Sequence, residues 1–301
     1  MKTLEGGQTP ALRAADLGRP MRPLNEISAD DYRYLQDYVY SRSGIVLDQD
    51  KHYLMDARLG PIVKKSRVPQ HRRPVQSVAR SQWRRRRERG GNDQAGRDQR
   101  DHHQRNFLLP RAGAIRRAAP HRASGADAQT QGHPEAAVLV SFASTGQEAY
   151  SLAMVLLDLG IDGWNVQITG TDLNDAVLQR ARAGRYFQLE VNRGLATTHL
   201  LRYFQRMGME WQIKEQVRRL AQFETFDLRK NFRGRGQYDV IFCRNVLIYS
   251  DLDTKRRILS ELRGALNPGG YLLLGAAETM VNADDKLRRL EIGGATFYEA
   301  S

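Results

Sequence analysis

The sequence predicts an α/β fold for the carboxyl-terminal half of the chain and a small all-α domain before it. From Ser141 to the end, helical periodicity alternates with short apolar runs that are typical of buried strands. Between residues 26 and 66, apolar residues recur only at helical spacing. A chain of 301 residues with 41% hydrophobic content is long enough for one large core and a small second domain.

The small all-α domain should start with a helix between Ser28 and Gly44, because Ser28 and Asp31 form a capping pair and glycine ends helices. A second helix should follow Asp50, and its exposed cations form either an ordinary solvated face or a docking surface. Residues 1–25 are rich in Gly, Pro and charge and lack apolar periodicity, so we expect a disordered leader.

The α/β half should contain three helices, two strands and a final hairpin that follows the turn Pro268-Gly269-Gly270. The expected helices are Gln147–Leu159, Ala176–Ala183 and Thr254–Leu266. The expected strands are Trp164–Thr169 and Tyr238–Cys243, with Tyr271–Gly275 and Thr296–Glu299 forming the hairpin.

Residues 67–140 form an anomalous basic segment that shows neither helical nor strand periodicity. Of the net charge of +13, the stretch Arg67–Arg122 contributes +12, from 16 arginines, no lysine and four acids. As written, the segment should be disordered, although so long a structureless loop is uncommon inside a compact domain. A basic arm that binds RNA is an alternative, but Trp83 and Phe107 are the only aromatic residues in this stretch available for base stacking.

Composition excludes several classes of protein. One cysteine, Cys243, excludes a disulfide framework, and the adjacent His102 and His103 have no acidic or cysteine partner near them in the sequence, so we expect no metal. The chain has neither the roughly 18 consecutive apolar residues of a membrane span nor an apolar secretory signal, so the expected location is the cytoplasm.

Glu148 lies in the first turn of an expected helix that follows the small residues Ser144-Thr145-Gly146. A ligand can approach the backbone closely at such a loop, and Glu148 could accept a hydrogen bond from an amino group or balance a cation. Ordinary helix capping explains the same pattern.

Asp172 follows an expected strand, about 25 residues after that loop. A carboxylate at the end of such a strand can accept hydrogen bonds from both hydroxyls of a ribose. The alternative is that Asp172 or Asn174 caps the next helix.

Four further residues at strand ends are candidates for cofactor binding. Asp227 suits an adenine amino group, with the backbone of Leu228 beside it. Arg244 and Asn245 end the apolar strand Tyr238–Cys243, and burying them requires partners, which favours a functional role over a core role.

Together these motifs closely resemble the chemotaxis receptor methyltransferases, the CheR family. The resemblance covers about residues 26–66 and 141–299, and a segment near 186–222 looks like the β-subdomain inserted in that family. The motifs that carry it are Ser144–Ser151 (STGQEAYS), Thr171-Asp172, Phe242–Tyr249 (FCRNVLIY) and Leu274–Thr279 (LGAAET).

The resemblance implies a Rossmann-type domain dependent on S-adenosylmethionine (SAM), which methylates glutamate side chains in the cytoplasmic region of membrane chemoreceptors. It implies no nucleic acid partner and no membrane insertion. By analogy, Tyr249 and Arg244 line the methyl-transfer site, and a buried core tyrosine is the alternative for Tyr249. A second possibility is a catalytically impaired SAM-binding or scaffold relative.

One motif of the family is missing. Between its two domains the family carries a motif close to TTNET, and residues 67–140 contain none. Codons that encode Asp101–Leu108 can, when read one base later, encode ITTNETS. We therefore hypothesise that two compensating frameshifts, near residues 67 and 141, displaced this segment from its true frame.

Overall fold

The computed structural model describes residues 29–48, 135–160, 164–275, 278, 286–292 and 295–300. Of these, 29–37 and Asp48 belong to one compact unit, and all the others belong to a second. The leader, the helix expected after Asp50 and residues 67–134 lie outside the described residues.

Helix α1 (Ala29–Ser43) confirms the helix expected before Gly44. Gly44 has a φ of 70°, the left-handed conformation in which glycine commonly ends a helix. Residues Tyr38–Leu47, which include the last turn of α1, belong to the second unit.

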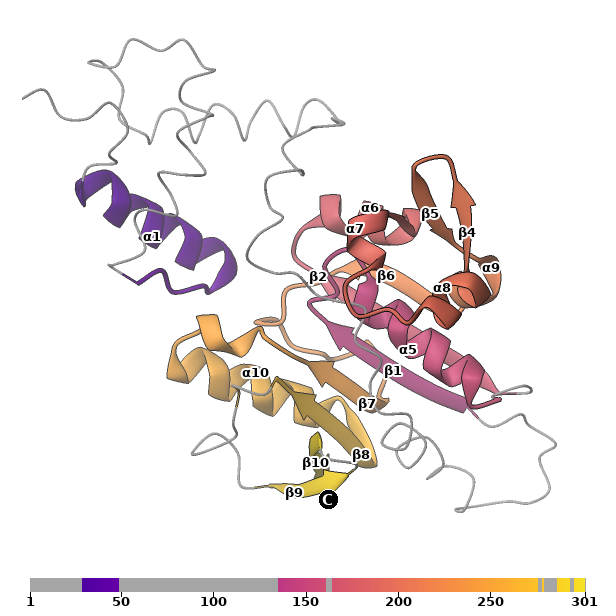
Figure 1. Cartoon of the computed structure of the whole chain (residues 1–301). Helices are drawn as coiled ribbons and strands as arrows, with labels where there is room; N and C mark the ends of the chain where they lie inside the picture. The colour runs from indigo at the N-terminus through magenta and orange to yellow at the C-terminus, as the bar shows by residue number, and fades with distance from the viewer. Residues whose placement is uncertain are drawn as a thin grey trace, which may run out of the picture. The chain divides into compact units, whose positions relative to one another are not determined.

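A seven-stranded sheet forms the second unit, with the strand order β6-β2-β1-β7-β8-β10-β9 (Figure 1). The first five strands in this order are parallel to one another, and β10 is antiparallel to both β8 and β9. The α/β fold is therefore confirmed, and the order reverses direction between β1 and β7. The strands are β1 (Glu135–Ser141), β2 (Asn165–Asp172), β6 (Ala221–Thr225), β7 (Tyr238–Cys243), β8 (Leu266–Leu274), β9 (Leu287–Ile292) and β10 (Ala295–Ala300).

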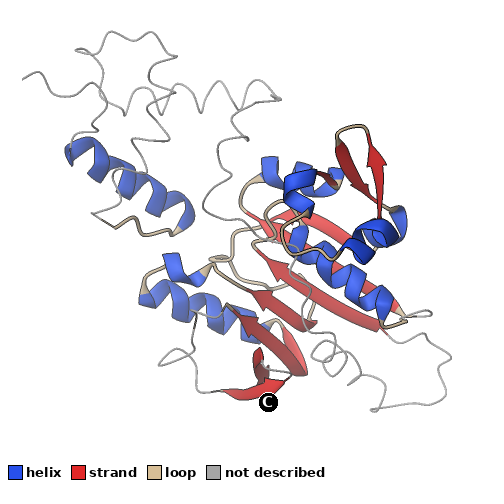
Figure 2. Cartoon of the chain, in the orientation of Figure 1, coloured by secondary structure: helices blue, strands red, loops and turns tan. Residues whose placement is uncertain are grey.

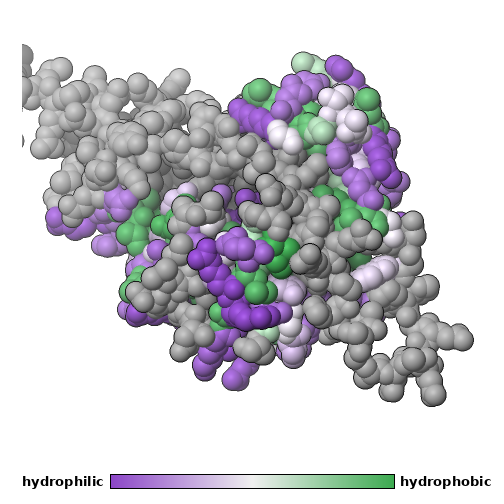
Figure 3. Space-filling model, turned by 60° about the horizontal axis from the view of Figure 1, so that its bottom comes forward, coloured by the Kyte–Doolittle hydropathy of each residue, from purple (hydrophilic) through white to green (hydrophobic). Residues whose placement is uncertain are grey.

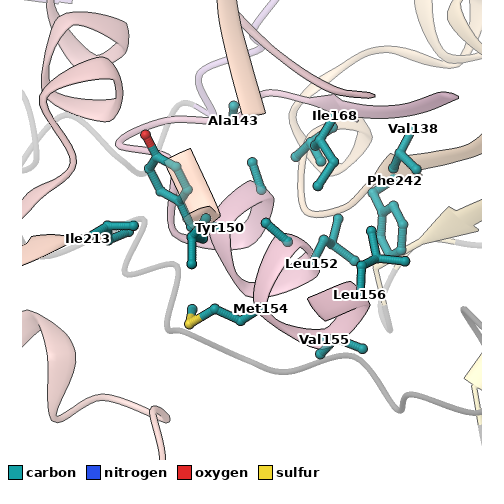
Figure 4. Close-up of a cluster of buried hydrophobic side chains, with 14 of the residues drawn as sticks. Val138, Ala143, Tyr150, Leu152, Met154, Val155, Leu156, Ile168, Ile213 and Phe242 are labelled. Atoms are coloured by element: carbon teal, nitrogen blue, oxygen red, sulfur yellow. The ribbon is translucent and has the colours of Figure 1, made fainter. Parts of the chain in front are cut away.

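Alternate residues of the central strands pack into two separate cores. Val138 and Val140 point into a cluster with the helix α5 (Gln147–Asp158), whereas Leu139 packs into a cluster with α10 (Leu252–Gly264). Figure 4 shows the first cluster, in which Leu152 and Leu156 of α5 lie toward Val138 and Phe242. These two helices and α6 (Asp175–Ala183) are among the helices drawn in blue beside the red strands in Figure 2.

Strand β1 corrects our expectation that residues 67–140 are disordered throughout. Residues Glu135–Ser141 form a central strand that pairs in parallel with both β2 and β7. Its run Ala136–Val140 is continuously apolar rather than alternating, as is usual in a strand buried on both faces, so the sequence there lacks the period of 2 that indicates a half-buried strand. The domain boundary placed at Ser141 was thus too late.

A small antiparallel sheet, with order β3-β5-β4, forms inside the segment expected for the inserted β-subdomain (Figure 1). Strand β6 was partly assigned to this insertion, but it pairs with β2 as an edge of the large sheet. The elements of the insertion are β3 (Arg185–Phe187), α7 (Gln188–Val191), α8 (Thr197–Tyr203), β4 (Phe204–Met207), β5 (Glu210–Ile213) and α9 (Glu215–Arg218).

The two strands expected for the final hairpin pair antiparallel, since Phe297 of β10 lies opposite Leu273 of β8, but they are not consecutive and so form no hairpin. The expected turn Pro268-Gly269-Gly270 lies inside β8. The expectation lacked β9, which lies between them in sequence and forms the other edge of the sheet. Arg288 and Arg289 expose charge on β9, which protects an edge strand from pairing with other chains. Figure 3, with the bottom of Figure 1 turned forward, shows hydrophilic residues gathered on this side.

Candidate active site at the carboxyl edge of the sheet

The predicted site residues meet where the parallel strands β1, β2 and β7 end. Ser141, the last residue of β1, lies opposite Thr171 on one side and Cys243 on the other. Asp172, the last residue of β2, and Arg244, the first residue after β7, therefore lie at the same edge of the sheet, on either side of β1. In open α/β sheets, ligands bind at this edge, where the strand order reverses.

The loop between β1 and α5 has an unusual backbone. Phe142, Ser144 and Gly146 have φ values of 65°, 52° and 91°. Left-handed conformations are uncommon for residues other than glycine and persist where surrounding contacts hold them, often at ligand sites. A Cβ at Gly146 would approach Ala181 Cβ to 3.0 Å and Phe223 Cζ to 3.1 Å, so glycine also suits the packing of this loop.

Asp172 holds this loop against β2, together with a hydrogen bond from Ala143 N to Thr171 O at 2.6 Å. Its Oδ2 accepts a hydrogen bond from Ser144 N at 3.0 Å, and its Oδ1 accepts one from Asn174 N at 2.9 Å. The cap of α6 is Asn174, whose side chain accepts a hydrogen bond from Ala176 N. Helix capping therefore does not account for Asp172, which is buried at the edge where the ribose was predicted to bind.

Glu148 and Arg244 form an ion pair across the edge of the sheet. Arg244 Nη1 donates to Glu148 Oε1 at 2.8 Å, and the Glu148 side chain is only 6% exposed. Arg244 thus has the acidic partner that its position at the end of β7 requires. The N-cap of α5 is Gly146, so Glu148 is no cap of its helix.

Asp227 lies after β6 and is held by Arg229. Arg229 Nε and Nη2 both donate to the Asp227 carboxylate, and the same guanidinium donates to Arg42 O at the end of α1 at 2.7 Å. Burial alone would raise the pKa of Asp227, but the hydrogen bonds from Arg229 outweigh it and keep the pKa below its ordinary value. The neighbouring Leu228 is buried.

Asn245 and Tyr249 lie in the turn that follows β7. Asn245 is left-handed, with a φ of 56°, and Tyr249 ends the short 3₁₀ helix η5 (Leu247–Tyr249). The carbonyl of Tyr249 accepts a hydrogen bond from Val46 N at 2.7 Å, so the segment after α1 is attached to this turn.

Two residues of the edge were not among our candidate site residues. Glu278 is buried and accepts hydrogen bonds from the backbone of the turn after β7, and Arg229 orients Asp227. Arg229 follows Asp227 by two residues, and this spacing was the only signal in the sequence. Glu278 had no such signal beyond its place in the LGAAET motif, because its partners lie about 30 residues away.

In the described part of the chain, no group of three His, Cys, Asp or Glu side chains could hold a metal ion. His102 and His103 lie outside the described residues. No described helix has the length and hydrophobicity of a membrane span.

A family model described as "CheR methyltransferase, SAM binding domain" matches residues 122–294, more than half of the chain. The chain belongs to the CheR methyltransferase family. The match begins upstream of Ser141, so the CheR domain includes strand β1. Family membership makes this chain a SAM-dependent methyltransferase, and the Rossmann-type sheet described above is its SAM-binding domain.

Two relatives show how far the CheR similarity extends. "Chemotaxis protein methyltransferase" of Vibrio parahaemolyticus is 30% identical over 286 residues, which cover 91% of this chain and 98% of the relative. "Chemotaxis protein methyltransferase 1" of Pseudomonas aeruginosa is 39% identical over 163 residues, 52% of this chain and 60% of the relative. Among solved structures, the glycopeptide N-methyltransferase MtfA with bound SAM has a TM-score of 0.32 and 20% identity, covering 64% of this chain and 66% of its own.

The chemistry of the edge fits SAM. The cofactor carries a sulfonium and an ammonium charge, two ribose hydroxyls and an adenine amino group, all of which are cationic or donate hydrogen bonds. The edge supplies three carboxylates, Glu148, Asp172 and Asp227, which are acceptors when ionised.

Proposed function

We propose that this CheR methyltransferase converts glutamate side chains in the cytoplasmic region of membrane chemoreceptors to methyl esters. The observation that carries the proposal is the set of three carboxylates, Glu148, Asp172 and Asp227, at one edge of a sheet of the CheR family. The names of the chemotaxis relatives support the choice of acceptor. Because that acceptor faces the cytoplasm, the protein would work there.

The reaction requires little acid or base chemistry from the protein. SAM supplies a methyl group bonded to a positively charged sulfur. A glutamate carboxylate has a pKa of about 4.3 and is already an ionised nucleophile at neutral pH. Its oxygen forms a bond to the methyl carbon as the sulfur–carbon bond breaks, which gives a methyl ester and S-adenosylhomocysteine. No proton moves in this step, so no general base is needed.

The protein would then act mainly by alignment. Holding the acceptor oxygen in line with the methyl and sulfur atoms can contribute several kcal/mol, about 7–11 kcal/mol at the limit. We assign the ribose hydroxyls to Asp172, the adenine amino group to Asp227 beside the Leu228 backbone, and the amino-acid end of SAM to Glu148. Arg244 would orient Glu148, while Asn245 and Tyr249 would border the transferred methyl.

The test is methyl transfer from SAM labelled in its methyl group to a purified cytoplasmic fragment of a chemoreceptor. We expect label that alkali releases as methanol, because a carboxyl methyl ester is hydrolysed by base and an N-methyl group is not. The same fragment with its acceptor glutamates replaced by glutamine is the control and should take up no label. A chain that binds S-adenosylhomocysteine but labels no receptor would instead be an impaired SAM-binding relative.

A further inference from the structure

One buried carboxylate accepts hydrogen bonds from the backbone of two segments at the carboxyl edge of the sheet. Glu278 Oε1 accepts hydrogen bonds from Val246 N at 2.8 Å, Leu247 N at 2.7 Å and Ile248 N at 3.3 Å. Its Oε2 accepts from Asn245 N at 2.7 Å and from Gly275 N at 2.8 Å. The residue is only 7% exposed.

These N–H groups need an acceptor because of where they lie. The first N–H groups of a helix have no carbonyl partner within it, and Val246, the N-cap of η5, supplies no side-chain cap. Glu278 satisfies them from a distant position in the sequence. Hydrogen bonds to an ionised acceptor are about twice as strong as neutral ones, and a carboxylate offers an acceptor oxygen on each side.

The same carboxylate keeps Asn245 in an unfavourable conformation. Asn245 has a φ of 56°, and its N–H donates to Glu278. A Cβ at Gly275 would overlap Asn245 Oδ1 and lie 2.6 Å from Glu278 Oε2, so the end of β8 passes close to both side chains. Glu278 thus ties the exit of β7 to the exit of β8.

We propose that Glu278 is a positioning residue of the methyltransferase, which holds the turn Asn245–Tyr249 in the conformation that binds SAM. The inference rests on the proposed function only in its expectation that methyl transfer depends on Glu278. The contacts themselves lie within the residues that match the SAM-binding domain of the CheR family. Glu278 acts through the backbone of the turn and is assigned no contact with the reacting atoms.

Two substitutions at Glu278 test the proposal by titration of the full chain with S-adenosylhomocysteine. In Glu278→Gln an amide NH₂ replaces one acceptor oxygen and faces backbone N–H groups, so we expect affinity to fall about tenfold or more. Glu278→Ala should lose at least as much and leave space for a small carboxylate. Added acetate should then recover part of the affinity of Glu278→Ala, and should leave the wild type and Glu278→Gln unchanged.

Glu261→Gln is the matched control. Glu261 Oε2 also accepts a backbone N–H, that of Phe232 at 3.1 Å, but Glu261 lies on α10. Its affinity for S-adenosylhomocysteine should equal that of the wild type. If Glu278→Gln and Glu278→Ala bind within about twofold of the wild type, or if acetate does not raise the affinity of Glu278→Ala, the positioning role is wrong. Failure of receptor methylation would leave this binding result intact, so the two proposals fail separately.

Discussion

Asp172 accepts two backbone hydrogen bonds and, in our proposal, also binds the ribose of the cofactor. Asp172→Asn keeps one acceptor oxygen but replaces the other by an amide that cannot accept from Ser144 N or Asn174 N. We expect affinity for S-adenosylhomocysteine to fall about tenfold or more, because one loop contact and one ribose contact compete for the remaining oxygen. Calorimetric titration measures this change.

Asp175→Asn provides the comparison for Asp172. Asp175 is an exposed acid three residues further on, paired with Arg182. Exposed ion pairs of this kind contribute about 0–1 kcal/mol, so the variant should bind like the wild type. Equal losses in the two variants would contradict the assignment of Asp172 to the ribose.

The sequence alone could identify the candidate acids, but not their partners. Asp172 and Arg244 follow apolar runs, and strand ends are predictable positions for ligands. The Arg244–Glu148 pair and the five donors of Glu278 depend on strand order and on turns that join distant residues. Residue types at single positions carry no information about such pairings.

At the scale of elements, Gly170 lets β2 and β6 pack closely. A Cβ at Gly170 would lie 2.6 Å from Phe223 Cδ1 and 3.0 Å from Ala143 Cβ. Gly170→Ala should therefore destabilise the fold by about 1–3 kcal/mol through overpacking. Urea denaturation gives the free energy of unfolding.

A glycine-to-alanine substitution in α10 should instead increase the free energy of unfolding. Nothing lies within 4 Å of a Cβ at Gly264, the last residue of that helix. Gly264→Ala should stabilise by about 0.4–1 kcal/mol, because it lowers the entropy of the unfolded chain. If both variants lose stability equally, close packing at Gly170 is not the cause.

Helix α10 also gives the fold a contribution to stability that depends on pH. The hydrogen bond from Thr254 N, together with those from the Tyr40 and Thr254 hydroxyls, lowers the pKa of Asp251, its N-cap, to about 2. Because the folded pKa lies below the unfolded value of about 3.9, this stabilisation is present at neutral pH and is lost as the pH falls from about 5 toward 2.

Asp251→Asn isolates that contribution, since asparagine also caps helices well but does not titrate. The urea midpoint of the wild type should exceed that of the variant at pH 7, and the gap should narrow as the pH falls from about 5 toward 2. Asp251→Ala removes the cap as well and should cost about 1 kcal/mol at neutral pH. A gap that is constant with pH would rule out the titration of Asp251 as its source.

Helices and strands were predicted correctly where their own sequence has a clear periodicity. They were not predicted where pairing with distant strands determines the structure. Helix α5 and strand β7 lie within one residue of their expected bounds, because each has a long apolar pattern between clear end signals. Strand β1 lies in the basic segment, where no strand was expected, and the first two residues of β6 fall within the bounds expected for the insertion. Both strands pair with β2, and no local sequence pattern reveals this pairing.

Across the whole second unit, Arg229 joins segments that lie far apart in the sequence. It donates to Asp227 and, at the last turn of α1, to Tyr40 O, Ser41 O and Arg42 O. Cations are favourable at a helix carboxyl terminus, so one guanidinium stabilises the helix end and the proposed adenine contact together. The segment Tyr38–Leu47 is thereby coupled to the proposed adenine contact at Asp227.

Arg229→Met should reveal this coupling as a change in how the affinity for S-adenosylhomocysteine depends on pH. Without the guanidinium, burial raises the pKa of Asp227, so the carboxylate becomes protonated at a higher pH than in the wild type. As the pH falls toward the ordinary carboxyl pKa of about 3.9, affinity for S-adenosylhomocysteine should therefore begin to weaken at a higher pH in the variant than in the wild type. Arg289→Met, on the exposed edge strand β9, is the control. Parallel pH profiles would contradict the coupling.

The anomalous basic segment is the remaining question at the scale of the whole chain. Two compensating frameshifts preserve length, which agrees with an alignment that spans 98% of the Vibrio parahaemolyticus relative. They also explain why one stretch of the chain carries nearly all of the net charge. Strand β1 and the family match both include residues before Ser141. If the second frameshift lies near residue 141, the residues encoded in the shifted frame must therefore still form β1.

The experiment compares two proteins by titration with S-adenosylhomocysteine: the chain as written, and a version in which residues 67–140 are restored to the shifted frame. The comparison tests whether the restored segment is needed to bind the cofactor. The restored version regains a motif close to TTNET, whose polar residues in the CheR family contact SAM or the acceptor. If the frameshift hypothesis is right, it should bind in the micromolar range and the written chain should bind far more weakly. Equal binding would mean that Glu148, Asp172, Asp227 and Asn245 suffice for the cofactor. Sequencing of the locus that excludes the required codons would reject the frameshifts themselves.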